Sequence, residues 1–301
     1  MGMARGRGRE LKKTIGTVSE SRSESVSAPL GLPAMVQMLF HSVLILISAV
    51  SIVPFVWMAL ASFKTFADLT RNPGLPNPWT WASYREIISR ANFASAFLNS
   101  GLVAAPRVVL GCLTSAAMGY VFAKYRFPGR DLLFTAFIAT MMVPFAAILV
   151  PLYVTLADLG LVNNLYGLIV FGAYNTFGFF LLRQSILGIP DDLIEAARMD
   201  GAGEFWVLVR IILPLCGAPL GALAVVIFLG SWDDYMLPSI LLTNPAVKTL
   251  PLVLAGLRNL YWERYELFAA GSMMTVVPVM LLYSIMQRQF TRGIALSGLK
   301  G

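Results

Sequence analysis

Long stretches without ionisable side chains are the dominant pattern along this sequence. Residues 25–63 contain only His41, and similar uncharged intervals recur towards the C-terminus. A helix needs about 20 apolar residues to cross the ~30 Å hydrocarbon core of a membrane, where it satisfies its own backbone hydrogen bonds. The pattern therefore predicts an all-α, polytopic membrane protein with six transmembrane helices near residues 35–61, 97–123, 132–155, 163–183, 214–241 and 268–287.

The composition agrees with this interpretation. The 301 residues are 57% hydrophobic and 13% charged, whereas soluble chains are about 45–50% apolar and about 25% charged. The surplus apolar side chains are expected to face lipid. Long buried helices of a soluble protein are the alternative, but such helices rarely run so far without a charge.

The distribution of Lys and Arg predicts the orientation. With six spans, fifteen of these residues fall on the side of the two termini and seven on the other, with Arg107 inside a span. The N-terminal tail and the tight turn KYRFPGRD (124–131) account for most of the difference. Because basic segments stay inside, both termini are expected in the cytoplasm and the chain in the cytoplasmic (inner) membrane. The net charge of +7 then requires no nucleic-acid-binding surface.

The N-terminal tail differs from the rest of the chain. RGRGRELKK followed by SESRSESVS has the low hydrophobicity of a disordered segment. We expect a disordered cytoplasmic tail at residues 1–30 and a membrane domain at residues 31–301. A signal peptide would have an apolar stretch of about 7–15 residues. Residues 34–63 are about twice as long, so the first span is expected to stay uncleaved.

One long cytoplasmic loop, residues 184–213, joins the fourth and fifth predicted spans. Pro190 halts the preceding helix, and Asp191 or Asp192 can cap a new one. Glu195 lies three residues after Asp192 and completes a capping-box pattern. The loop is therefore expected to form a short helix outside the membrane.

Four residues of the predicted loop helix are expected to share one face. Its members at positions i, i+3, i+4 and i+7 are Leu193, Ala196, Ala197 and Asp200. Gly201 and Gly203 are expected to end this helix, and a second helix is expected to begin near Glu204. The small alanines would permit close approach by another surface.

At this loop the sequence resembles a known family, the inner-membrane permease subunits of bacterial binding-protein-dependent ABC importers. Their signature is EAA, three residues, Gly, nine residues and then I-x-L-P, with the fuller form EAAxxDGA. The matching residues are Glu195, Ala196, Ala197, Asp200, Gly201, Ala202, Ile211, Leu213 and Pro214. In the family this loop is the helix that couples the permease to its ATPase, so the resemblance implies that role here.

Other segments resemble the sugar-uptake branch of that family, specifically the second permease of maltose-type systems. They are YRFPGR (125–130), PLYVTLADLGLVNNLYGLI (151–169), SWDDYMLPSILLT (231–243) and the ending RGIALSGLKG (292–301). The resemblance implies a subunit that moves a sugar, polyol or oligosaccharide by alternating access, with another small polar solute as the alternative. One departure is Asp233, where the branch usually has Asn.

The resemblance also implies the partners. They are a companion permease subunit, cytoplasmic ATPase subunits that hold ATP and Mg, and an extracytoplasmic solute-binding protein docked on the outer segments 64–96 and 243–266. This chain would itself be no enzyme and hold no cofactor or metal. In the family the C-terminal tail can reach the ATPase interface, so Gly298–Gly301 could do so here, with a frayed end as the equal alternative.

Three charged residues fall inside predicted spans, where each costs about 2.5–3.5 kcal/mol on insertion scales. They are Arg107, Asp233 and Asp234. One interpretation is a polar translocation pathway. Its further sugar-contacting candidates are Asn175, Trp232 and Tyr235. The other interpretation is a structural Arg–Asp pair inside the helix bundle, and the sequence leaves both open.

Other classes of membrane protein fit less well. A self-contained ABC exporter needs a GxxxxGK[ST] phosphate loop, which the chain does not contain. A secondary transporter or channel would not explain the EAA pattern. An enzyme would need clustered nucleophiles or metal ligands, and the single His and two Cys do not supply them.

Overall fold

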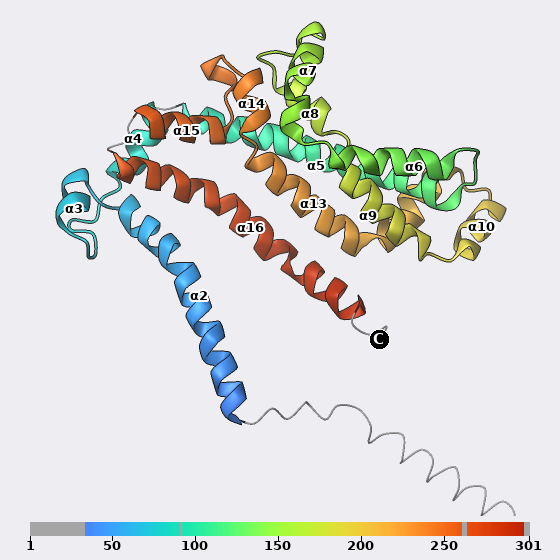
Figure 1. Cartoon of the computed structure of the whole chain (residues 1–301), viewed down its shortest axis with the longest axis horizontal. Helices are drawn as coiled ribbons and strands as arrows, with labels where there is room; N and C mark the ends of the chain where they lie inside the picture. Colours follow the sequence, from blue (N-terminus) through green and yellow to red (C-terminus); the bar gives the residue numbers. More distant parts are fainter. Residues whose placement is uncertain (1–33, 91, 261–263, 298–301) are drawn as a thin grey trace, which may run out of the picture. The chain divides into compact units, whose positions relative to one another are not determined.

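The computed structural model describes residues 34–90, 92–260 and 264–297. The predicted tail at residues 1–30 and the segment Gly298–Gly301 lie outside the described residues. All regular secondary structure in the described part is helical (Figure 1). The chain divides into two units, residues up to Val56 and residues from Trp57 onward.

The described part of the first unit is the start of α2 (Ala34–Ser62). This helix has no charged residue, and it is long and apolar enough to cross a membrane by itself. Its large apolar side chains from Met35 to Val56 are exposed, as expected of a helix that faces lipid or another subunit.

The second unit consists of many shorter helices and two long ones. Its α-helices are α3 (Phe66–Arg71), α4 (Ala82–Arg90), α5 (Phe93–Lys124), α6 (Arg130–Ala139), α7 (Phe145–Asp158), α8 (Leu165–Gly172), α9 (Thr176–Leu187), α10 (Asp191–Met199), α11 (Glu204–Val207), α12 (Leu213–Leu215), α13 (Gly217–Trp232), α14 (Met236–Leu241), α15 (Leu250–Leu260) and α16 (Tyr265–Ser297). A π-helical turn covers Leu208–Ile212, and 3₁₀ turns cover Thr140–Met142 and Pro245–Val247.

Five segments of the described chain are long and apolar enough to span a membrane. The predicted span at 132–155 is not a straight helix, because α6 with its 3₁₀ turn meets α7 at 103°. The bend lies at Val143, whose φ of −81° and ψ of 118° are extended. The following Pro144 disfavours helical backbone at the residue before it. If the bent pair counts as one span, the number of spans is six.

Helix α5 organises the second unit, because α8, α9 and α13 all pack along it (Figure 1). Glycines make this packing close. A Cβ on Gly119 would lie 2.9 Å from the backbone nitrogen of Arg183 in α9, and one on Gly111 would lie 2.8 Å from Ile227 in α13. Small residues at helix interfaces permit this approach inside membranes.

Two other predicted spans are interrupted where they pass α5. The span at 163–183 breaks between α8 and α9, at residues 173–175, and the span at 214–241 breaks between α13 and α14, at residues 233–235. Irregular backbone at membrane depth is tolerated only where protein buries it or where it lines a cavity. Arg107 of α5 contacts Leu168 in α8, and it contacts Ser231 and Asp234 at the second break.

Candidate functional site

Arg107 is the buried centre of the site. Its side chain projects from α5 and the residue is 5% exposed. Nε donates to the Leu168 carbonyl oxygen at 2.8 Å, and Nη1 donates to Asp234 Oδ2 at 3.1 Å and to Ser231 Oγ at 3.3 Å. The guanidinium therefore joins α8 to the end of α13, and its charge is balanced by the carboxylate of Asp234.

Gly172, the last residue of α8, makes room for this arginine. A Cβ at Gly172 would overlap the Nε and Cδ atoms of Arg107. Any larger side chain at Gly172 would force the guanidinium out of its position. The break that follows α8 is thus placed directly against the buried charge.

Side-chain hydrogen bonds stabilise the break between α8 and α9. Asn175 caps α9, since its Oδ1 accepts from the Gly178 N–H at 2.7 Å. Thr114 Oγ1 donates to the Ala173 carbonyl at 2.7 Å, and Ser115 Oγ donates to the Asn175 carbonyl at 3.3 Å. These bonds satisfy backbone groups that a continuous helix would have paired.

A cavity of about 660 Å³ opens beside the two breaks and Arg107. Its polar lining residues are Arg107, Thr140, Asn175, Thr176, Ser231 and Asp234, and its aromatic lining residues are Phe145, Phe171 and Tyr174. Phe145 and Phe171 lie with ring centroids 5.6 Å apart. Aromatic faces next to amide, hydroxyl and carboxylate groups suit a polar solute that has apolar ring faces.

The structure separates the predicted pathway residues. Arg107, Asn175 and Asp234 line the cavity, whereas Asp233 and Tyr235 are exposed at the break between α13 and α14.

Trp232, the last predicted pathway residue, lies in the hydrophobic core instead. It is 4% exposed, stacks on Phe228 at 5.4 Å, and donates its indole N–H to the Thr275 carbonyl. These contacts hold α13 against α16 and do not bring Trp232 into the cavity.

Sequence reasoning missed the aromatic wall of the cavity. Tyr174 and Thr176 flank Asn175, and a polar triplet in the middle of an apolar span was the signal that could have drawn attention to them. Phe145, Phe171 and Thr140 carried no such signal. They reach the cavity because the chain bends at Val143 and breaks after Gly172.

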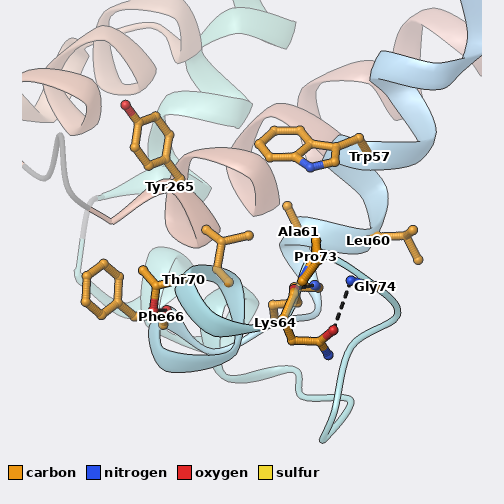
Figure 2. Close-up of a pocket in the computed structure, with 11 residues that line it drawn as sticks. Trp57, Leu60, Ala61, Lys64, Phe66, Thr70, Pro73, Gly74 and Tyr265 are labelled. Atoms are coloured by element: carbon orange, nitrogen blue, oxygen red, sulfur yellow. Dashed lines mark hydrogen bonds between the residues drawn. The ribbon is translucent and has the colours of Figure 1, made fainter.

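A second cavity, of about 530 Å³, lies among the last turns of α2, α3 and the start of α16 (Figure 2). Trp57, Leu60 and Tyr265 contribute to its largely apolar wall. Lys64 is 3% exposed and donates to the Asn72 carbonyl at 2.5 Å. Because this ammonium group is already engaged within the protein, the second cavity is a weaker candidate for a polar solute.

The predicted loop helix exists as α10, but its cap is different. Pro190 occupies the N-cap position and no side chain caps the helix, so the predicted capping by Asp191 or Asp192 with Glu195 is wrong. Asp191 is already within the first turn, and its Oδ1 accepts from Lys124 Nζ at 2.6 Å. This neighbouring ammonium group lowers the pKa of Asp191.

Helix α10 buries one side and presents the other. Ile194 and Ala197 are buried, in a core with Leu182 and Ile212, whereas the other residues of the helix are exposed. The predicted common face is therefore divided, with Ala197 turned inward. The outward residues are Leu193, Glu195, Ala196, Met199 and Asp200. Met199 is 88% exposed.

Gly201 ends α10, as predicted, in the left-handed conformation with φ of +84°. The Ala202 N–H donates to the Ala197 carbonyl at 2.9 Å and the Gly201 N–H donates to the Arg198 carbonyl at 3.0 Å. This is the Schellman arrangement, in which glycine avoids the penalty of a Cβ. The space around a Cβ at Gly201 is open within 4 Å.

The end of the signature motif packs against the same core. Ala202, Ile211 and Leu213 are partly buried there, and Pro214 is exposed within the short helix α12. The π-helical turn before Leu213 lets the chain pass from the loop into α13.

A polar cluster that the sequence did not indicate holds the loop to α5. Glu204 accepts from Arg198 Nε at 2.9 Å with Oε1 and from the Tyr120 hydroxyl at 2.7 Å with Oε2. Arg198 Nη2 also donates to the Tyr125 hydroxyl at 3.1 Å. These bonds, with Arg198 as the main cause, lower the pKa of Glu204 to about 2. Glu204 therefore stays ionised at any physiological pH.

Comparison with known proteins gives matches to one family. Residues 114–295 match the family described as binding-protein-dependent transport system inner membrane component. The arabinooligosaccharides transport system permease protein AraQ of Halalkalibacterium halodurans is 34% identical over 261 residues, which cover 85% of this chain and 93% of that protein. The diacetylchitobiose uptake system permease protein NgcG of Streptomyces coelicolor is 33% identical, with 85% and 86% covered.

A solved structure has the same fold. One chain of a bacterial ABC transporter involved in the import of the acidic polysaccharide alginate superposes with a TM-score of 0.76 and is 23% identical in sequence. The match covers 87% of this chain and 99% of that one.

Proposed function

This chain belongs to the binding-protein-dependent transport system inner membrane components, and on that premise we propose that it is a permease subunit of an ATP-driven importer for an oligosaccharide or related sugar. The observation that carries the proposal is the cavity at the helix breaks. It combines aromatic rings with hydroxyl, amide and carboxylate groups next to a charge-balanced Arg107. The relatives named for arabinooligosaccharide and diacetylchitobiose transport support the same substrate class.

The mechanism we propose is alternating access driven from outside this chain. A separate ATPase, carrying ATP and Mg, would receive the exposed face of α10, and its closure would move the loop. The discontinuous helices around Arg107 would then re-arrange to open the cavity to one side at a time. Broken helices around a central site supply such movement in other transporters.

The proposed assembly also contains a companion permease subunit and a solute-binding protein. The family is binding-protein-dependent, and the segments 64–96 and 243–266 are the proposed docking surface for that protein. With both termini in the cytoplasm, as the distribution of Lys and Arg favours, these segments face outward and α10 faces the ATPase.

The test is sugar uptake by the complete transporter, made by co-expressing this chain with the products of its neighbouring genes. Gly201→Val should abolish uptake while the protein stays in the membrane, because a left-handed backbone costs roughly 1–2 kcal/mol for a residue with a Cβ and most for a β-branched one. The reshaped end of α10 should also weaken co-purification of the ATPase.

Gly203→Val is the matched control. Gly203 lies in the same loop with a φ of −74°, and a Cβ there meets nothing within 4 Å. It should leave uptake close to wild type. Normal uptake and normal ATPase co-purification in Gly201→Val would contradict the proposed role of the loop. Uptake that needs neither an ATPase nor a solute-binding protein would instead favour a secondary transporter.

A further inference from the structure

One helix, α5, holds both parts of the proposed transport machinery. Arg107 in its middle contacts the two broken helices, and Tyr120 near its end contacts Glu204 of the loop. The two residues are thirteen positions apart in one continuous helix, which at 1.5 Å per residue is about 20 Å. A movement of the loop could therefore reach the cavity through this helix alone.

The helix between these two points is well suited to move as a rigid body. It is unbroken from Arg107 to Tyr120, and its proline, Pro106, lies before this stretch. Ser115 and Ala116 are fully packed, and Gly119 lies directly against the backbone of α9. A displacement applied at Tyr120 would therefore be passed along the helix and not absorbed by bending.

Glu204 makes a polar connection between the loop and this helix, beside the hydrophobic core that Ile194 and Ala197 share with Ala116 and Tyr120. Its two oxygens are used by different elements, with Oε1 accepting from Arg198 at the end of α10 and Oε2 accepting from Tyr120 of α5. Its own backbone begins α11. The carboxylate thus joins α10, α11 and α5 at one point, next to the end of the exposed face of α10.

A second connection joins the end of α5 to the start of α10. Lys124 at the end of α5 donates to the Ile189 carbonyl and to Asp191, whose side chain is 71% exposed. Only the Asp191 side of this pair faces solvent, because the Lys124 side chain is 8% exposed. This pair holds the start of α10, whereas Glu204 holds its end.

We propose that Glu204 and Tyr120 are positioning residues that fasten the coupling loop to α5, so that the ATPase stroke is delivered to Arg107 and the cavity. The proposal rests on the proposed function. Without this fastening, the loop would still dock on the ATPase through the exposed face of α10. ATP would then be hydrolysed with less movement of the cavity, and less sugar would be transported for each ATP.

The experiment measures sugar uptake and ATP hydrolysis in the same proteoliposomes of the complete transporter. Glu204→Ala should lower uptake per ATP hydrolysed about tenfold, the size expected for losing a hydrogen bond to a charged group, with hydrolysis within about twofold of wild type. Tyr120→Phe removes one hydroxyl and should lower the ratio by a smaller factor. If the two side chains act together, the double variant should be no worse than Glu204→Ala.

The ratio is the useful readout because a folding defect lowers uptake and hydrolysis together. Asp131→Asn is the matched control, since Asp131 is an exposed carboxylate that accepts from Arg130 at 3.0 Å, close in sequence to the end of α5. Its ratio should equal that of wild type. Glu204→Gln keeps an acceptor for Tyr120 but loses the charge, so it should be intermediate, and it serves if Glu204→Ala does not assemble.

A wild-type ratio in both Glu204→Gln and Tyr120→Phe would overturn the proposal, as would an equal loss in Asp131→Asn. These outcomes leave the proposed function intact, because the wild-type transporter would still show ATP-driven uptake. Wild-type proteoliposomes that take up no sugar with ATP would instead overturn the proposed function, and the proposal with it.

Discussion

The two arginine–carboxylate pairs attached to α5 have similar geometry and very different surroundings. Arg107 and Asp234 lie 3.1 Å apart with side chains 6% and 18% exposed, whereas Arg198 and Glu204 lie 2.9 Å apart with side chains 39% and 50% exposed. The N–O distances alone would suggest that the two ion pairs are equally strong. Burial separates them, because water screens the second pair more strongly than the first.

The difference indicates what each pair can do. A buried pair is costly to break, since removing one partner leaves the other charge without compensation. An exposed pair contributes little to stability. The role we assign to Arg198 and Glu204 is therefore to hold the loop in one position against α5. The pair of Arg107 and Asp234 therefore stabilises the fold around the cavity. The pair of Arg198 and Glu204 connects the loop to the end of α5.

Breaking the buried pair should have the largest effect. Asp234→Ala leaves Arg107 buried without a counter-ion, a change that costs about 3–5 kcal/mol in comparable buried pairs. We expect a large loss of folded protein in the membrane and a lower thermal transition in detergent. The double variant Arg107→Ala with Asp234→Ala should recover part of both, because it removes the uncompensated charge.

The neighbouring Asp233 is the control for that prediction. Its side chain is exposed at the same break, so Asp233→Ala should retain near-normal amounts of folded protein. Equal losses from Asp233→Ala and Asp234→Ala would show that the pair with Arg107 is not what stabilises the break.

Replacing a helix-capping asparagine should have a smaller effect, and that effect should differ between a cap that lines the cavity and one that does not. Asn175 and Asn164 both cap helices, with Oδ1 accepting from the Gly178 N–H at 2.7 Å and from the Tyr166 N–H at 3.0 Å. Replacing either by Ala should cost about 1 kcal/mol of stability. Asn175 also lines the cavity, so Asn175→Ala should raise the sugar concentration that gives half-maximal uptake, whereas Asn164→Ala should leave it unchanged. An equal shift in both would argue against sugar contact at Asn175.

The coupling loop was predictable because its signals are local. Pro190 and Gly201 mark the ends of α10 through their own backbone preferences, and the structure has the expected left-handed glycine. The predicted capping by Asp191 or Asp192 failed because the helix begins at Asp191 with Pro190 at the N-cap, and the Asp191 carboxylate accepts from Lys124, which is distant in sequence. Position along the chain cannot reveal such a partner.

The cavity was less predictable because hydropathy does not show where the helical backbone of an apolar span is interrupted. Residues 163–183 and 214–241 are apolar enough to be taken as continuous spans, yet each is interrupted beside Arg107. The charge at Arg107 indicated that something polar lies there, but not which carboxylate it meets. Asp233 and Asp234 are equal candidates in the sequence, and the turn after α13 places only Asp234 against Arg107.

The smallest expected effect is that of pH on the loop cluster. The pKa of Glu204 is lowered to about 2 by its bonds from Arg198 and Tyr120, and that of Asp191 is lowered by Lys124. A lowered pKa means that the contribution to stability is complete above the ordinary pKa of about 4.3 and is lost as the pH falls towards the folded value. Burial raises the pKa of Tyr125, so its hydroxyl stays protonated at mildly alkaline pH.

The loop should therefore be held equally well from about pH 5 to pH 8 and should loosen only below about pH 4.3. A switch based on histidine would instead change within the range of about pH 5 to pH 8. The Gly201 and Ala202 amides donate to carbonyls of α10, so their hydrogen-exchange rates report how firmly the end of this helix is held. The rates must first be corrected for the intrinsic pH dependence of amide exchange. Protection relative to amides of α5 should stay flat across pH 5–8 and fall in acid. In Glu204→Gln the acid-induced fall should be smaller, since its side chain does not titrate. A change in protection between pH 6 and pH 7 would mean that a group outside the Glu204 cluster controls how the loop is held.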